Sequence, residues 1–371
     1  DAARGQVAQL QDQLSNSMPT NGSVEIHDGE TGLSGQIIQR MEELAQSLAK
    51  TRKQRKFPDL SPLEEVKRLK CAQSQNTFHH KTAAGVLCVD VHKADPSRIV
   101  TGGVDCQVVL YNAQKQKKVQ TMVGHSKKVT AVKLHGDKDV VVSASQDATA
   151  KVWTSSGDWT SQYSCLHTIH KHRAEVTDLS IHPLGDYLLT ASLDKSWAIH
   201  DFATGRCLRH MKDLESGFPS MSFHPDGLIV AGGTEDKTVI IWDVKNEQAT
   251  VATLTGHESP VQTLSFSGNG YYLASGSRDG VVKLWDLRKP VNLQTLQVSG
   301  GVSSVCFDTT GQYLAVASNI VQVFNFETKT SLTEAVSLKD HTDAVTGLSW
   351  GPNAKSLASV SLDHSLKVYS A

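Results

Sequence analysis

The sequence predicts an all-β fold, a propeller of seven four-stranded sheets, and two observations carry this prediction. First, an aspartate or asparagine returns between residues 105 and 363 at intervals of 42, 47, 42, 43, 40 and 44 residues. Second, strand-length apolar runs surround it, separated by glycine-rich or Asp-Gly turns; in the clearest copy they span 261–266, 271–277 and 281–285. A period of about 40–45 residues is that of one propeller blade.

Each repeat carries the same residue types at fixed distances from its turn residue. The turn residues are Asp105, Asp147, Asp194, Asp236, Asp279, Asn319 and Asp363. A bulky ring follows six residues later, or five in the sixth repeat: Tyr111, Trp153, His200, Trp242, Trp285, Phe324 and Tyr369. A histidine stands 22 residues before the aspartate in four repeats, and a hydroxyl four residues before it in five. With its Gly-His opening and Trp-Asp close, the copy at 256–286 resembles the WD40-repeat family.

These sets look superficially like a hydrolase triad, in which a nucleophile is held against an oriented base. An active site occurs once, however, whereas these residues recur together at a fixed period. We therefore expect structural networks that run from the indole through the hydroxyl and histidine to the aspartate and satisfy buried polar groups. Their members are His125, Ser143, Asp147 and Trp153; His172, Thr190 and Asp194; His257, Ser275, Asp279 and Trp285; and His341, Ser359 and Asp363.

Three repeats depart from the pattern, and one connection is long. The first has Thr82 where the histidine is expected, and the fourth has Gly232 in place of the hydroxyl. The sixth has lost histidine, aspartate and tryptophan together. An insertion over 154–171 carries Trp159 and Tyr163. Irregular repeats and long connections are where a ring most easily gains partner-specific surface.

The last repeat ends after its third strand, near residues 366–370. We expect residues 75–80 to supply the missing strand, because pairing the two ends would close the ring and leave no open edge. The propeller is therefore assigned to residues 75–371.

Three segments precede the propeller. Residues 1–14 read as the C-terminal end of a coiled coil, or alternatively as a frayed amphipathic end, and residues 15–35 as a flexible linker. Residues 36–74 form a helical and basic connecting segment, with one helix carrying an apolar stripe of Ile37, Met41, Leu44 and Leu48. A second helix is expected to begin with Ser61 as its N-cap. The basic run 50–56 is a nuclear address, a phosphate contact or a solvated helix end.

Composition narrows the function classes. With 37 basic and 38 acidic residues, the net charge of −1 gives no global attraction to nucleic acid. No apolar run of 18 residues occurs, so we expect no membrane contact. Six scattered cysteines without a Cys-x-x-Cys pair argue against zinc and disulfides. His79-His80 and His170-x-His172 are read as loop residues rather than metal ligands. We expect no catalytic residue, no metal and no cofactor within this sequence.

The most promising binding residues lie on the top face, which gathers the loop before each first strand and the residue before each turn aspartate. Candidates are Lys127, Lys128, Arg173, Glu175, Glu235 and Arg278. Arg278 is the first choice because arginine most often anchors interfaces. The alternative is that all six are ordinary surface charges.

A closer resemblance covers essentially the whole sequence. The coiled-coil end, the linker, the Ile-Ile-Gln-Arg-Met helix, the basic run, the Leu-Ser-Pro-Leu-Glu-Glu-Val segment and the ring together resemble the pre-mRNA-processing factor nineteen family. Its members are U-box ubiquitin ligases of the splicing nineteen complex. Because the first residue is Asp1 rather than Met, we expect the sequence to begin inside a longer protein.

The resemblance implies that a U-box outside this sequence recruits a ubiquitin-conjugating enzyme and that an upstream coiled coil forms a homotetramer. It implies that the propeller binds ubiquitination substrates and spliceosomal nineteen-complex subunits. It further implies a nuclear location, a role in spliceosome activation and a second role in the DNA-damage response. Two alternatives stay open: a non-catalytic adaptor propeller in a nuclear complex, and a direct nucleic-acid binder that uses residues 50–56.

Overall fold

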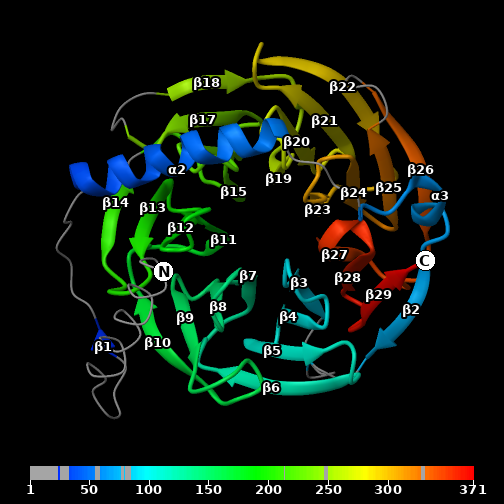
Figure 1. The fold of residues 1–371 in the computed structure, drawn as a ribbon, viewed down its shortest axis with the longest axis horizontal. Helices are drawn as coiled ribbons and strands as arrows, with labels where there is room; N and C mark the ends of the chain where they lie inside the picture. Colours follow the sequence, from blue (N-terminus) through cyan, green and yellow to red (C-terminus); the bar gives the residue numbers. More distant parts are fainter. Residues whose placement is uncertain are drawn as a thin grey trace.

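The computed structural model describes residues 24–25, 33–54, 59–76, 79, 85–212, 214–245, 250–326 and 331–371. Seven antiparallel sheets surround a central axis, so the predicted seven-bladed propeller is confirmed (Figure 1). Within a blade, strands that follow one another in the chain are hydrogen-bonded neighbours. Because each blade is built from hairpins of consecutive residues, the sequence period maps directly onto the blade count.

The strands of the first four blades follow in chain order. Blade one contains β3 (Val86–Val91), β4 (Arg98–Gly103), β5 (Gln107–Asn112) and β6 (Lys117–Val123). Blade two contains β7 (Val129–Leu134), β8 (Val140–Ser145), β9 (Ala150–Ser155) and β10 (Tyr163–Ile169). Blade three contains β11 (Val176–Ile181), β12 (Tyr187–Ser192), β13 (Ser196–Asp201) and β14 (Cys207–Met211). Blade four contains β15 (Ser220–Phe223), β16 (Ile229–Gly233), β17 (Val239–Asp243) and β18 (Thr250–Leu254).

The remaining blades complete the ring. Blade five contains β19 (Val261–Phe266), β20 (Tyr272–Ser277), β21 (Val281–Asp286) and β22 (Val291–Gln297). Blade six contains β23 (Ser304–Phe307), β24 (Tyr313–Ala317), β25 (Val321–Phe326) and β26 (Leu332–Leu338). Blade seven contains β27 (Val345–Trp350), β28 (Ser356–Ser361), β29 (Leu366–Ser370) and, as its outer strand, β2 (Lys70–Gln75). A two-residue strand, β1 (Val24–Glu25), pairs in parallel with β10.

The ring is closed by β2, which pairs antiparallel with β29 so that Lys70 lies opposite Ser370 and Gln75 opposite Leu366. Closure by the two chain ends was predicted, but its location at 75–80 was wrong. The closing strand is polar, with alternating exposed and half-buried residues, because an outer strand has only one face to bury. An apolar strand was sought there, and the apolar signal of Phe78 misled the prediction.

The apolar core lies between neighbouring blades rather than within them. One cluster, for example, joins Tyr272 and Leu284 of blade five to Val305 and Phe307 of blade six. Hydroxyls on the inner strands add bonds across the blade boundaries. At the closure, Thr346 donates to the carbonyl of Val86 at 2.7 Å, which ties blade seven to blade one.

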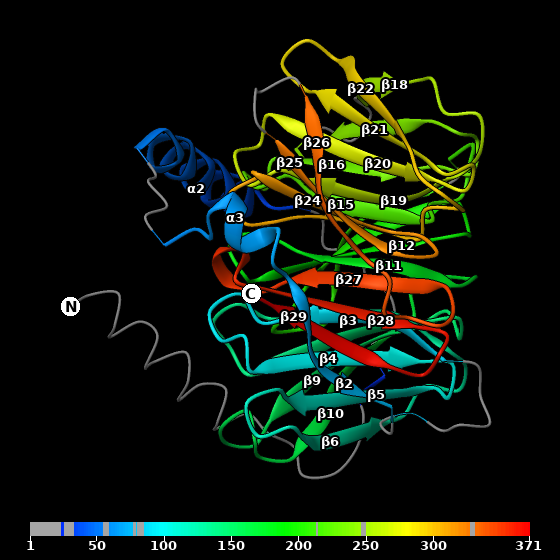
Figure 2. The same cartoon turned by 90° about the vertical axis from the view of Figure 1, so that its right-hand side faces the viewer.

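Two helices lie on one side of the ring, which we call the helix face (Figure 2). Helix α2 (Gly35–Gln54) buries Met41 and Ala45 against the cluster of blades three and four. The ion pair between its Arg40 and Asp186, in the turn after β11, spans 3.1 Å. Of the predicted stripe, Met41 is buried, and Ile37, Leu44 and Leu48 are half-buried. The buried Ala45 was not part of that prediction.

Helix α3 (Leu63–Val66) packs Val66 and, just after it, Leu69 on the blades six and seven cluster. The prediction that Ser61 caps this helix was wrong: Pro62 is the N-cap residue and no side-chain capping bond forms. The Ser61 carbonyl instead accepts a bond from the Tyr313 hydroxyl at 2.9 Å. The predicted coiled-coil end at 1–14, most of the linker at 15–35, and residues 55 and 56 of the basic run lie outside the described residues.

Candidate functional site

Backbone bonds join the two kinds of loop that make up the top face. The Gln146 amide, just before a turn aspartate, donates to the Lys128 carbonyl at 3.0 Å. The same bond joins Leu193 to Glu175 and Glu235 to Gly217, at 3.2 and 3.1 Å. Since strands within a blade are antiparallel, these turns lie at the end opposite the helix face. The top face is therefore a set of anchored loops around the axis.

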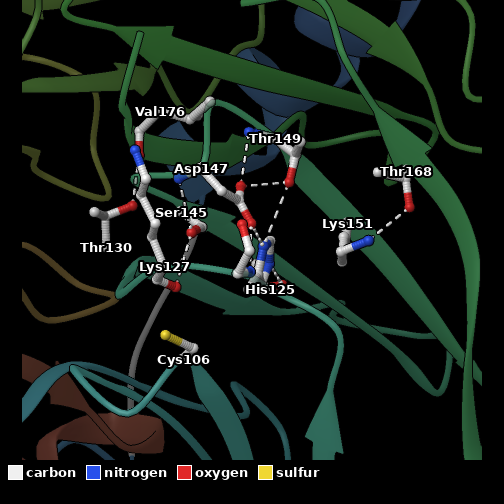
Figure 3. Close-up of polar contacts among 12 residues, drawn as sticks. Cys106, His125, Lys127, Thr130, Ser145, Asp147, Thr149, Lys151, Thr168 and Val176 are labelled. Atoms are coloured by element: carbon white, nitrogen blue, oxygen red, sulfur yellow. Dashed lines mark hydrogen bonds and ion pairs between the residues drawn. The ribbon is translucent and has the colours of Figure 1, made fainter. Parts of the chain in front are cut away.

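In blade two the structure brings the four predicted network residues together (Figure 3). The Trp153 indole N–H donates to Ser143 Oγ at 2.9 Å, and Ser143 lies 2.8 Å from His125 Nε2. His125 Nδ1 lies 2.9 Å from Asp147 Oδ2. Although burial raises the pKa of Asp147, bonds from His125, Thr149 and a backbone amide hold it well below its usual range. The ionised carboxylate thus fixes the imidazole.

Blades three and seven build the same arrangement. His172 lies 3.1 Å from Asp194 and 2.8 Å from Thr190, and His341 lies 2.9 Å from Asp363 and 2.6 Å from Ser359. In blade three, His200 takes the place of the tryptophan, with its Nε2 3.1 Å from Thr190. Burial lowers the pKa of His200 well below its usual value, so a neutral ring fills this position.

Blade five does not complete its network. His257 Nε2 lies 2.7 Å from Ser275, and Trp285 donates to the same hydroxyl at 2.8 Å. His257 Nδ1 has no hydrogen-bond partner, and Asp279 accepts from the Val281 amide at 2.9 Å instead. The expected bond between His257 and Asp279 is therefore not formed. Burial lowers the pKa of His257 to about 4.

The break has a local cause. In blades two, three and seven, a hydroxyl two residues after the aspartate contacts both the histidine Nδ1 and the carboxylate: Thr149, Ser196 and Ser365. Val281 stands at this position in blade five and has no hydroxyl to offer. The imidazole and carboxylate of blade five therefore lack the group that bridges them elsewhere.

Blade one is completed by a residue that the sequence reading set aside. Thr82 was assigned to the histidine position, and His79 was read as a loop residue. In the structure, His79 Nδ1 lies 2.8 Å from Asp105 and its Nε2 lies 3.0 Å from Thr101. The side chain is buried, with 1% of its surface exposed. It stands 26 rather than 22 residues before the aspartate, so a search at one fixed distance missed it.

Blade four replaces the polar network with aromatic packing. A side chain at Gly232 would come within 3.0 Å of both Phe218 and Trp242. These two rings meet edge to face at 5.5 Å. Losing the hydroxyl removes the hydrogen-bond partner of a histidine, and an apolar ring occupies the space instead.

A second periodic set of histidines was not found from the sequence. His135, His182 and His224 each end a first strand on the helix face, and each Nε2 meets a glycine carbonyl of the next blade at 2.8, 3.2 and 2.8 Å. These carbonyls belong to Gly185, Gly227 and Gly270, which have positive φ. The regular spacing of the three histidines was the available signal. They join neighbouring blades and so serve the fold.

All six predicted binding residues lie in the loops or turns of the top face. Four of them are exposed: Lys127, Arg173, Glu235 and Arg278. The other two, Lys128 and Glu175, form an ion pair at 3.4 Å that links the loops of blades two and three. The structure therefore brings together one pair and leaves four charges facing outward.

The insertion of blade two packs against blade one. The Arg98 guanidinium lies 5.0 Å from the centre of the Trp159 ring, and Arg98 also pairs with Asp95 at 3.0 Å and Asp139 at 2.7 Å. Arg98 and Trp159 also line a shallow depression there. Because these contacts already occupy the ring and the cation, this insertion acts as a brace between blades.

The described residues contain no group of histidine, cysteine, aspartate and glutamate placed to hold a metal ion. Burial raises the pKa of the Cys88 thiol to about 12, which keeps it from acting as a nucleophile at neutral pH. No described helix is long and apolar enough to cross a membrane.

Comparison with known proteins places this architecture in a family. The model of the Prp19 WD40 domain matches residues 78–363. A *Caenorhabditis elegans* protein named pre-mRNA-processing factor 19 is 41% identical over 378 residues, covering 100% of this chain and 74% of the relative. The *Bos taurus* protein of that name is 40% identical over 346 residues, covering 91% of this chain and 67% of the relative. The chain belongs to the Prp19 family of WD40 propellers.

Proposed function

We propose that this chain is the partner- and substrate-binding platform of a U-box ubiquitin ligase that acts in the splicing nineteen complex. Family membership carries the proposal, since relatives of this chain bear the name pre-mRNA-processing factor. The geometry agrees with binding rather than chemistry. The described histidine, hydroxyl and aspartate sets hold loops in place, and charged side chains face outward between those loops.

The parts of the ligase beyond this chain belong to the same proposal. A U-box would recruit the ubiquitin-conjugating enzyme, and a coiled coil ending near residue 14 would assemble a homotetramer. The segment 15–35 would tether the propeller to them. Such a ligase forms no covalent intermediate of its own, and its rate comes from holding the loaded enzyme near the substrate. The protein would act in the nucleus, in spliceosome activation and in the DNA-damage response.

A second function is favoured by one observation. The described residues offer no histidine, serine and aspartate set that is free for catalysis, since the complete sets are repeated and tie loops together. The chain could therefore serve as an adaptor that gathers splicing proteins without directing ubiquitin to them.

Affinity capture tests the binding role. The chain is immobilised, incubated with nuclear extract, and its partners are identified by mass spectrometry. We expect splicing proteins in the wild-type sample and their reduction by Arg278→Glu, which reverses an exposed top-face charge. Lys355→Glu is the matched control, because Lys355 is exposed in the turn between β27 and β28 on the helix face. Equal capture by Arg278→Glu and wild type would count against Arg278 as an anchor.

Ubiquitin transfer separates the two functions. The full-length protein is compared with a version lacking the propeller, using a partner found by capture as the substrate. The ligase proposal expects modification of that partner to fall while self-modification persists. Unchanged modification of the partner would leave the adaptor role.

A further inference from the structure

Three exposed cations gather where blades two and three meet on the top face. Lys127 lies in the loop before β7, Arg173 in the loop before β11, and Lys195 in the turn after β12. None of the three makes an ion pair with another residue in the described part of the chain. We call these three residues the basic arc.

The backbone beneath each cation is anchored. The Arg173 amide donates to Asp194 Oδ2 at 2.8 Å, and Lys195, which follows that aspartate, accepts a bond from Leu214 through its carbonyl at 3.2 Å. The Lys127 carbonyl accepts from Ser145 Oγ at 3.1 Å (Figure 3). Because these loops are already ordered, a ligand need not pay for ordering their backbone.

The charge of the arc is not cancelled by the nearest acid on the surface. Glu175 lies in the same loop as Arg173, but its carboxylate is paired with Lys128 at 3.4 Å. That pair also links the loops that carry Lys127 and Arg173. By contrast, the loop before β27 presents Asp340 and Asp343, so the top face is basic on one side and acidic on the other.

An apolar side chain borders the arc. Val123 is 70% exposed, the highest value among the exposed large hydrophobic residues of the described chain. It ends β6, four residues before Lys127. A valine presented to solvent beside cations suits a ligand that carries apolar as well as negative groups.

We propose that the basic arc and Val123 bind an acidic segment of a partner protein, one with several aspartate or glutamate residues and a neighbouring apolar residue. The inference rests on the proposed binding function and names the chemistry of one partner. The protein class is favoured over nucleic acid because base stacking needs exposed aromatic rings. Among the described residues, the one exposed large aromatic is Tyr271, which lies in the turn after β19 on the helix face.

A synthetic probe tests the proposal. A fluorescein-labelled peptide of glutamates with one central leucine is titrated with the chain, and its anisotropy is measured at low and physiological salt. The control peptide has glutamine at every glutamate. We expect the acidic peptide to bind, the glutamine peptide not to bind, and salt to weaken the binding because the contacts are exposed.

Variants locate the site. The double variant Lys127→Glu with Arg173→Glu should weaken binding about tenfold or more, because it reverses two charges at the contact. Lys355→Glu on the helix face makes the same kind of change and should bind as the wild type. Val123→Ser should weaken binding less than the double variant. Unfolding midpoints equal to that of the wild type show that each variant is folded.

Binding that survives the double variant unchanged would overturn the proposal. Tighter binding of a labelled oligouridylate than of the peptide, lost in the same double variant, would also overturn it in favour of nucleic acid. The capture experiment in nuclear extract distinguishes the two levels. Captured splicing proteins without peptide binding would refute the arc alone, and peptide binding without captured splicing proteins would refute the proposed splicing function alone.

Discussion

The networks of blades two and five make a matched experiment, because the same substitution should have different effects in each. In blade two, Asp147 accepts bonds from His125, the Ser126 amide and Thr149, at distances of 2.6 to 3.0 Å. In blade five, the Asp279 carboxylate accepts one bond, from the Val281 amide. Asp147→Ala should therefore remove several bonds to a charged acceptor, and Asp279→Ala only one.

The magnitude follows from the groups left behind. Asp147→Ala strands the buried His125 N–H, and hydrogen bonds to charged groups contribute about 1.5–3 kcal/mol each, so we expect a loss of about 3 kcal/mol. Asp279→Ala should cost about 1 kcal/mol, because His257 Nδ1 already lacks a partner. Urea unfolding followed by tryptophan fluorescence measures both. Equal losses for the two variants would show that the carboxylate does not stabilise through the histidine.

Three further predictions concern stability. His79→Ala should destabilise the protein by about 2 kcal/mol, because it leaves Asp105 and Thr101 without their buried partner, whereas removal of a free loop residue would change nothing; thermal unfolding checks this. The folded-state pKa of His182 is lowered to about 4 by burial, so its unfolded state binds the proton first. Its stabilising contribution should be complete above about pH 6.5 and be lost as the pH falls toward 4, by about 3 kcal/mol in all. Urea unfolding between those pH values should show a smaller loss in His182→Gln, and an equal slope would contradict it. Met41→Ala should cost about 2–5 kcal/mol by opening a cavity under α2, and calorimetry that shows no change would refute the packing of that helix.

The number of blades could be predicted because the signals that carry it are local. Each blade is a run of consecutive strands, and its turn aspartate, hydroxyl and aromatic ring lie within about one repeat of each other. The distance from Ser143 to Trp153, for example, follows from the hairpin that pairs β8 with β9. Patterns of this kind survive in a single sequence, so the ring and most of its networks were visible before the structure.

Individual partners were harder to predict, because they depend on loops of variable length. His79 reaches Asp105 from a longer loop, and Val281 removes the bridge that would join His257 to Asp279. Neither outcome follows from a fixed spacing. The three charges of the basic arc are also far apart in the sequence, although anchored loops bring them to one face.

The sequence by itself determined the repeat, the blade count and the closure of the ring by its own ends, since these depend on strand periodicity and short hairpins. Tertiary structure alone decided which residues close it, because β2 is an outer strand whose polar, half-exposed sequence carries little apolar signal. It also decided how blades join, since the bonds of His135, His182 and His224 connect residues more than forty positions apart. Contacts between blades are set by packing in three dimensions, which no local period records.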